Sequence, residues 1–394
     1  MQNKRIPYLC LLLTVILFQS CGIGARLNKA NKRYEIGEYA AAADLYKSVY
    51  SRTPSNNKAQ RAEIAFKLGE CYRLINHYRA EQVYQNAIRN KYPNDTVYLR
   101  LAQMQMRNGK YAEAAKSFTT FLQSNSGSEL AKNGLEASSY ALQLKSDPTR
   151  YIVKSSKGFN ASRSSSFSPV FMNSDADALL FTSNRKIGKK NVVRKNNGVS
   201  GQPNNHLFMV KKNSAGKWED ILPLEGEVTT GNDEGVASVS PDGRSMYFTR
   251  SNTIADKGGG TQILLSSRAG GTWSAPQRIQ LFRDSTISVA HPAIAPDGLT
   301  MYFVSDNPAG LGGKDIWKAT NESGEWKYVE NLGPDINTSG DEMFPSVRND
   351  GTLYFSSNGK SGMGGLDIFR AKSKKEGGWE VGNMGVPINS QNDD

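Results

Sequence analysis

The chain has 394 residues, 22% of them charged and 38% hydrophobic, which is the composition of a globular protein with room for at least two domains. Its formal net charge of +12 allows nucleic acid, anionic lipid or acidic polymers as partners. It contains 3 cysteines and 3 histidines, which argues against a disulfide framework and against histidine-based acid–base catalysis.

The first twenty residues have the pattern of an export signal. Lys4 and Arg5 precede an apolar run over residues 6–18, which is too short to span a bilayer as a helix because a span takes about 20 residues. Cys21 follows, flanked by small residues, at the place where the leader of a bacterial lipoprotein is cleaved and its cysteine acylated. We therefore predict a lipoprotein signal peptide over residues 1–20 and lipidation of Cys21. The alternative is an ordinary signal peptide with a chance cysteine.

The predicted export limits which partners the positive charge can serve and which roles the cysteines can have. It argues against nucleic acid as a partner, and the densest basic stretch, residues 185–195, lacks the interleaved aromatic residues that stack on bases. This stretch is interpreted as a solvated loop or as a contact for an acidic partner. With Cys10 in the leader and Cys21 at the cleavage site, Cys71 stands alone, so neither an intrachain disulfide nor a cysteine-ligated metal is expected.

From residue 27 to about residue 144 the chain is rich in Ala, Leu, Tyr, Lys and Glu and repeats itself. Small residues allow paired helices to approach closely, glycines supply turns between helices, and prolines end the second helix of a pair. These residues are Ala42, Gly69, Ala102 and Ala114 (close approach), Gly37 and Gly109 (turns), and Pro54 and Pro93 (helix ends). The pattern resembles the tetratricopeptide repeat, which implies a helical solenoid over residues 21–148 that binds peptides or protein surfaces on its concave side.

Three such units are about the smallest number that stack stably, and residues 130–144 are expected to form a helix over the last apolar face. The aromatic residues of the repeats are predicted to be packing residues rather than binding residues. They include Tyr72, Tyr84 and Phe118, with Cys71 as a small apolar filler in the same core.

After Pro148 the composition shifts to Gly, Ser, Asn, Asp and alternating aromatic residues, which predicts β structure. Four copies of one unit follow, each with a tight turn, an apolar-aromatic strand, a glycine-rich approach to a further strand, and a closing tryptophan. The tryptophans lie 53 to 55 residues apart and are Trp218, Trp273, Trp326 and Trp379. Glycine accepts positive φ in the turns Pro241-Asp242-Gly243, Pro296-Asp297-Gly298 and Asn349-Asp350-Gly351.

These units resemble the Pro-Asp-Gly type of WD-like β-propeller repeat of periplasmic proteins, which implies one four-stranded blade per copy. The predicted fold is therefore α+β and multidomain, a tetratricopeptide solenoid followed by a β-propeller over residues 149–394. The resemblance implies six blades where four are visible, and residues 389–394 match the stretch 337–342 ahead of the fourth copy, so a truncated propeller is expected. Ile152 and Val153 are predicted to form an outer strand that pairs with the last blade.

Sequence motifs for catalysis or metal binding are lacking. The histidines are expected in a helical-repeat turn (His77) and at strand positions that other residues fill in sister blades (His206 and His291). Gly359-Lys360-Ser361 imitates the end of a phosphate-binding loop but lacks its upstream glycine, so it is interpreted as an ordinary loop. Asp233-Glu234 and Asp341-Glu342 recur at one place in successive blades, which favours a structural role over calcium binding. No catalytic residue, metal site or cofactor is predicted.

A lipoprotein leader, tetratricopeptide repeats and this propeller together resemble the PorE-like outer-membrane lipoproteins associated with the type IX secretion system. The resemblance implies a non-enzymatic scaffold that Cys21 anchors to the periplasmic face of the outer membrane, where it docks envelope or secretion-system proteins. Family members continue with a carboxypeptidase-regulatory-like domain and an OmpA-like domain that binds peptidoglycan, so a peptidoglycan contact is implied only for a longer parent chain. A propeller that senses or binds a glycan or peptide ligand is the alternative, and a propeller hydrolase is a third class.

Overall fold

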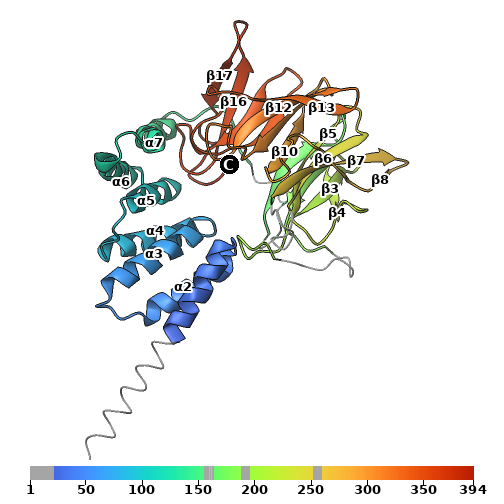
Figure 1. The fold of residues 1–394 in the computed structure, drawn as a ribbon. Helices are drawn as coiled ribbons and strands as arrows, with labels where there is room; N and C mark the ends of the chain where they lie inside the picture. The colour runs from blue at the N-terminus through green and yellow to red at the C-terminus, as the bar shows by residue number, and fades with distance from the viewer. Residues whose placement is uncertain (1–21, 155–158, 160, 162–163, 188–195, 252–259) are drawn as a thin grey trace, which may run out of the picture.

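The computed structural model describes residues 22–154, 159, 161, 164–187, 196–251 and 260–394. A curved stack of helices is followed by four antiparallel sheets (Figure 1), which confirms the predicted helical-repeat and propeller layout. The predicted lipidation site Cys21 and residues 188–195 of the basic stretch lie outside the described residues.

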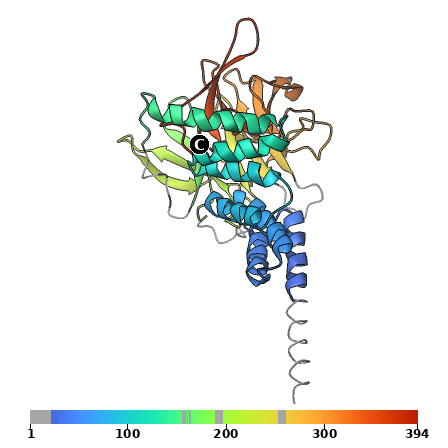
Figure 2. The ribbon, with the colours of Figure 1, turned by 90° about the vertical axis from the view of Figure 1, so that its left-hand side faces the viewer.

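The helices follow one another through the stack in chain order (Figure 2). A helix over residues 22–35 precedes α2 (Tyr39–Arg52), α3 (Lys58–Arg73), α4 (His77–Arg89), α5 (Thr96–Arg107), α6 (Tyr111–Ser124) and α7 (Glu129–Ser146). Three of them begin at a side-chain cap, in which Asn57, Asn76 and Ser128 each accept a backbone N–H from the first helical turn. None of the helices in the described ranges has both the length and the apolar character needed to cross a bilayer.

Small residues set the distance between neighbouring helices, as predicted. A Cβ at Gly69 would lie 2.5 Å from the ring of Tyr84, so glycine is required where α3 and α4 meet. Gly37 and Gly109 have φ values of 76° and 70° and form the turns that precede α2 and α6. The residues predicted to form the core are all buried, namely Tyr72, Tyr84, Phe118 and Cys71.

Each of the four sheets is one blade with its strands arranged mainly in chain order. The first contains β1 (Ser166–Phe171), β2 (Ala178–Ser183), β3 (His206–Lys212) and β4 (Trp218–Pro223), and the second β5 (Glu234–Val239), β6 (Ser245–Ser251), β7 (Thr261–Ala269), β8 (Thr272–Trp273) and β9 (Gln277–Arg278). The third contains β10 (Val289–Ile294), β11 (Thr300–Ser305), β12 (Asp315–Glu322) and β13 (Glu325–Asn331), and the fourth β14 (Glu342–Val347), β15 (Leu353–Ser357), β16 (Asp367–Ser373) and β17 (Trp379–Asn383).

Apolar side chains of the propeller are buried between neighbouring blades. Side chains alternate along a strand, so Phe248 of β6 packs toward the first blade while its neighbour Tyr247 packs toward the third. In the same way, Phe303 of β11 joins the cluster with the second blade and Val304 the cluster with the fourth. A blade is therefore covered on its two faces by two different neighbours.

The first strand of every blade carries a bulge with a residue in the left-handed region. The residues and their φ values are Ser168 (51°), Val236 (44°), His291 (50°) and Phe344 (54°), each at a shift in strand register. In the second, third and fourth blades the bulge turns a backbone N–H toward the preceding blade. Val236 N donates to Thr182 Oγ1 and His291 N to Thr249 Oγ1, both at 2.8 Å, so these bonds lock the blades to one another.

The change Thr249→Val removes the acceptor of the His291 N–H at nearly constant side-chain size. An unpaired buried donor costs about 1–3 kcal/mol, so we expect hydrogen–deuterium exchange over residues 289–294 to become roughly tenfold faster, as measured by mass spectrometry. Thr119→Val is the control, because the Thr119 hydroxyl donates to Ala115 O within its own helix. Unchanged exchange in the Thr249 variant would contradict the locking role.

The predicted outer strand at Ile152 and Val153 is not formed, which corrects the sequence interpretation. Both residues lie outside the strands of the described sheets and are 80% and 62% exposed. The contact with the last blade is made earlier in the chain, where Thr149 N donates to Val386 O at 2.6 Å. The chain leaves α7 against the turn that follows β17, so it does not run along the edge of that strand.

Residues 389–394 occupy the place on the fourth blade that residues 337–342 occupy on the third. The equivalent hydrogen bonds are Ile316 N to Asn337 Oδ1 and Ile368 N to Asn389 Oδ1 (both 2.8 Å), and Glu342 N to Lys314 O and Asp394 N to Leu366 O (both 2.7 Å). The similarity of the two stretches in sequence therefore reflects one structural element, the connection that leads away from a blade after its fourth strand.

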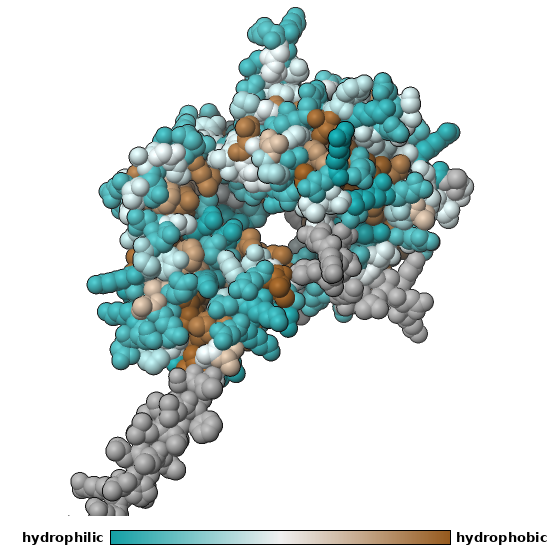
Figure 3. Space-filling view, in the orientation of Figure 1, coloured by the Kyte–Doolittle hydropathy of each residue, from teal (hydrophilic) through white to brown (hydrophobic). Residues whose placement is uncertain are grey.

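The helical stack touches the propeller near both of its ends. Helices α5 and α7 contact the fourth blade, and near the start of α2 the Ala40 N–H donates to Gly198 O at 3.5 Å. The space-filling view shows an opening through the molecule between the helices and the blades (Figure 3).

Candidate interaction site

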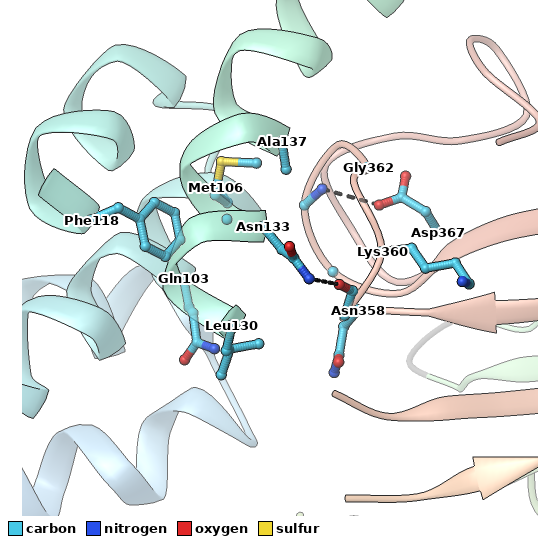
Figure 4. Close-up of a pocket in the computed structure, with 14 residues that line it drawn as sticks. Gln103, Met106, Phe118, Leu130, Asn133, Ala137, Asn358, Lys360, Gly362 and Asp367 are labelled. Carbon is cyan, nitrogen blue, oxygen red and sulfur yellow. Dashed lines mark hydrogen bonds between the residues drawn. The ribbon is translucent and has the colours of Figure 1, made fainter. Parts of the chain in front are cut away.

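The contact between the helices and the fourth blade is centred on one glycine-rich loop. This segment, residues 358–366 between β15 and β16, is called the fourth-blade loop. It lies against α5 and α7 (Figure 4), and a cavity of about 40 Å³ remains beside it. The cavity is lined by residues of both parts, including Met106, Phe118 and Ala137 of the helices and Gly362, Gly364 and Asp367 of the blade.

The tip of the fourth-blade loop is an apolar anchor. Met363 is 1% exposed and belongs to the hydrophobic cluster of the last helices, which includes Met106 and Phe118. Burying a methionine side chain contributes about 1.5–3 kcal/mol. Met363 therefore helps to hold the helices on the blade.

Polar contacts flank this anchor. Asn133 on α7 donates from Nδ2 to Gly359 O at 3.1 Å, the bond drawn between helix and loop in Figure 4. At the end of α5, Arg107 forms an ion pair with Asp393. Burial lowers the pKa of the nearby His77, and the charge of Arg107 lowers it further. One hydrogen-bond donor, one cation and one apolar groove on the helices thus meet complementary groups of the propeller.

Asp367 at the start of β16 holds the loop in shape. Its Oδ2 accepts the N–H of Met363 at 2.8 Å and that of Gly364 at 3.3 Å. A Cβ at Gly362 would lie 2.2 Å from the same oxygen, so glycine is required where the loop wraps around the carboxyl group. The other oxygen, Oδ1, is buried and has no hydrogen-bond partner among the described atoms.

We expect Asp367 to make stability depend on pH. Burial raises its pKa from the ordinary value of 3.8 to about 7, against the two backbone hydrogen bonds, and Asp394 and Asp393 add to the rise. The folded chain thus binds this proton more tightly than the unfolded chain, and stability falls as pH rises from about 4 through about 7. Between about pH 5 and about pH 8, calorimetry should show a larger fall in unfolding temperature for wild type than for Asp367→Asn.

The amide of Asp367→Asn can still accept the two N–H groups and carries no charge, which is why its pH dependence should be smaller. Asp284→Asn is the matched control, because hydrogen bonds from Thr286 lower the pKa of this exposed carboxyl and it titrates below the tested range. Equal pH dependence in wild type and Asp367→Asn would show that the buried carboxyl is not the titrating group.

Truncation of the anchor should loosen the helices. Met→Ala in a packed core costs about 2–5 kcal/mol, so Met363→Ala should speed deuterium exchange over residues 130–137 of α7. Leu142→Ala on the same helix is the control, since Leu142 is 55% exposed. If the two variants exchange alike, Met363 does not anchor the contact.

The histidines are dispersed, and His291 has a structural role. In the first two blades, Thr182 and Thr249 accept the bulge N–H of the next blade, but the third blade has Val304 at this position. Here His291 Nδ1 accepts the Phe344 N–H of the fourth blade instead, at 3.3 Å. The two rings also stack, with centroids 4.2 Å apart. Burial lowers the pKa of His291 to about 3, so the ring is neutral and Nδ1 is free to accept.

In both acidic pairs predicted to be structural, the glutamate is the centre of a buried hydrogen-bond network. Glu234 is 0% exposed and contacts His206 Nδ1 at 2.7 Å and Arg250 Nε at 3.2 Å. Glu342, also 0% exposed, accepts the N–H of Thr338 and the hydroxyl of Ser357 at 2.7 Å and 2.6 Å. Within the described residues no cluster of three or more potential ligands is arranged to hold a metal ion.

Gly359-Lys360-Ser361 lies in a loop as predicted, and Lys360 Nζ donates to Asp335 O at 2.7 Å. Sequence reasoning missed that this loop docks into the helices. The recurrence of Gly-Leu-Gly-Gly-Lys-Asp at 310–315 and Gly-Met-Gly-Gly-Leu-Asp at 362–367, with an apolar residue at the same place, indicates a shared loop shape but does not tell which copy meets the helices.

Comparison with known families identifies the type of helical repeat. A tetratricopeptide repeat model matches residues 96–128, which contain α5 and α6. This match covers one repeat, so it shows the repeat and not a family for the whole chain. No curated protein matches the chain.

Solved structures with similar parts include a Mycobacterium tuberculosis puromycin-hydrolysing peptidase, at 16% identity over 56% of this chain and 30% of that one, with a TM-score of 0.34. An α-L-arabinofuranosidase from Lactobacillus brevis is similar at 13% identity over 57% and 78%, with a TM-score of 0.34. A Dyadobacter fermentans protein of unknown function is similar at 13% over 54% and 59%, with a TM-score of 0.32. The chain thus spans less than a third of the peptidase, and similarity this low carries no conclusion about activity.

Proposed function

We propose that the chain is a non-enzymatic scaffold that binds other proteins of a bacterial cell envelope. The observation that carries the proposal is the seating of Met363 in the helical groove, flanked by the Asn133 and Arg107 contacts. Tetratricopeptide repeats and propeller blades both expose broad side surfaces, which suits docking. In support of a non-enzymatic role, His206 and His291 are engaged in contacts that hold the blades together.

We further propose that Cys21 carries the lipid that anchors the chain to the outer membrane on its periplasmic side. The leader over residues 1–20 supports this, and two or more acyl chains would hold more durably than one. The order of modules, which resembles that of PorE-like lipoproteins, supports type IX secretion-system proteins as partners.

A serine at the cleavage site tests the anchor and the scaffold together. In its native cells, wild type should fractionate with membranes, carry acyl groups on Cys21 and be recovered with envelope proteins after cross-linking. Cys21→Ser should lose the acyl groups and the membrane fraction, because serine has no thiol to acylate. Cys10→Ser, within the leader, is the control and should remain anchored. An unmodified Cys21 in wild type would refute the anchor, and a hydrolytic turnover lost on mutation of His206 or His291 would refute the non-enzymatic role.

A further inference from the structure

The third blade carries a second copy of the docking loop. This segment, residues 306–314 between β11 and β12, is called the third-blade loop. Asp315 accepts the N–H of Leu311 through Oδ2, as Asp367 accepts that of Met363, and in both aspartates Oδ1 is buried without a described partner. A Cβ at Gly310 would lie 2.2 Å from Asp315 Oδ2, the same distance as for Gly362 and Asp367. The two loops therefore present the residue at the tip in the same way.

The two loops differ in what covers them. Met363 is 1% exposed beneath the helices, whereas Leu311 is 49% exposed. Around the tip, Gly359, Gly362 and Gly365 are buried in the fourth-blade loop, and Pro308, Ala309 and Gly312 are exposed in the third-blade loop. An apolar knob of defined shape is thus held toward solvent by a buried carboxyl group.

The groups that flank the knob are repeated as well. Asp341 takes the place of Asp393, the residue that pairs with Arg107. The contacts of the Asp341 carboxylate with Lys314 Nζ and Asn358 Nδ2 are long, at 3.5 Å and 3.4 Å. Asn307 O takes the place of Gly359 O, which accepts from Asn133; it accepts one bond from Gly310 N at 2.9 Å and has a second lone pair. The third-blade loop thus repeats the apolar residue at the tip, the carboxylate and the carbonyl group of the fourth-blade loop.

We propose that the third-blade loop docks a helical-repeat surface of another protein, built like the groove that α5 and α7 offer to the fourth-blade loop. Such a surface has a groove between packed helices, lined by small and apolar residues, with an amide donor and an arginine beside it. The proposal rests on the scaffold function and names a surface and a partner class for it. A second copy of this chain is a poor occupant, because its own groove is filled by its own Met363.

Photo-cross-linking in native cells tests the docking. Leu311→p-benzoylphenylalanine in the full-length anchored chain should cross-link to a peptide of a partner that maps to a helical repeat. Leu299→p-benzoylphenylalanine is the matched control, since Leu299 is 55% exposed in the turn at the other end of β11. Equal products at both positions, no product at 311, or a product that maps to a β-sheet, to a membrane lipid or to this chain would overturn the proposal.

A charge at the knob provides an independent readout. Leu311→Asp should reduce the amount of the cross-linked partner recovered by about tenfold or more, while Leu299→Asp leaves it unchanged. Both side chains are exposed, so both variants should keep the wild-type circular dichroism spectrum and membrane fraction. If Leu311→Asp still recovers the envelope proteins at wild-type amounts, the third-blade loop is not the docking surface and the scaffold function stands. If wild type itself recovers none, the scaffold function fails as well.

Discussion

Burial of each repeat by its neighbour is the constraint on which this molecule depends. A blade such as the second covers its two faces with different partners, through Phe248 on one side and Tyr247 on the other. Neighbouring helices bury one another in the same way, because Gly69 on one helix leaves room for the ring of Tyr84 on the next. Units of this kind have little stability alone, so stability grows along the array and every terminal unit needs a cover of another kind.

The two terminal covers show how the constraint joins the parts of the molecule. On the first blade, Phe159 and Trp218 pack over the cluster formed by Phe181 and Phe208. On the last helices, the cover is supplied by Met363 of the propeller. The same contact that completes the solenoid therefore fixes the solenoid to the fourth blade. Docking between parts of the chain is a consequence of how repeats are stabilised.

The repeats could be predicted from the sequence because they are local. Glycine turns, small residues at helix contacts and the recurring tryptophans follow from spacings within one unit, and the buried Glu234 and Glu342 follow from recurrence between units. Docking is not local, since Asn133 and Gly359 are 226 residues apart. Leu311 and Met363 look alike in sequence, and their surroundings alone tell them apart. Ile152 and Val153 have strand propensity, but propensity does not specify which edge is within reach. Lipidation of Cys21 stays a prediction.

The separation of the docking partners in sequence also orders the events of synthesis. A nascent chain leaves the ribosome with its N-terminus first, so the helices can pair before any blade exists. The ion pair of Arg107 can form only after Asp393, 286 residues later in the chain, has been synthesised. Until that segment arrives, the groove of the last helices faces solvent with its apolar lining uncovered. The helical groove is thus closed only after the segment of the fourth blade that contains Asp393 has been synthesised.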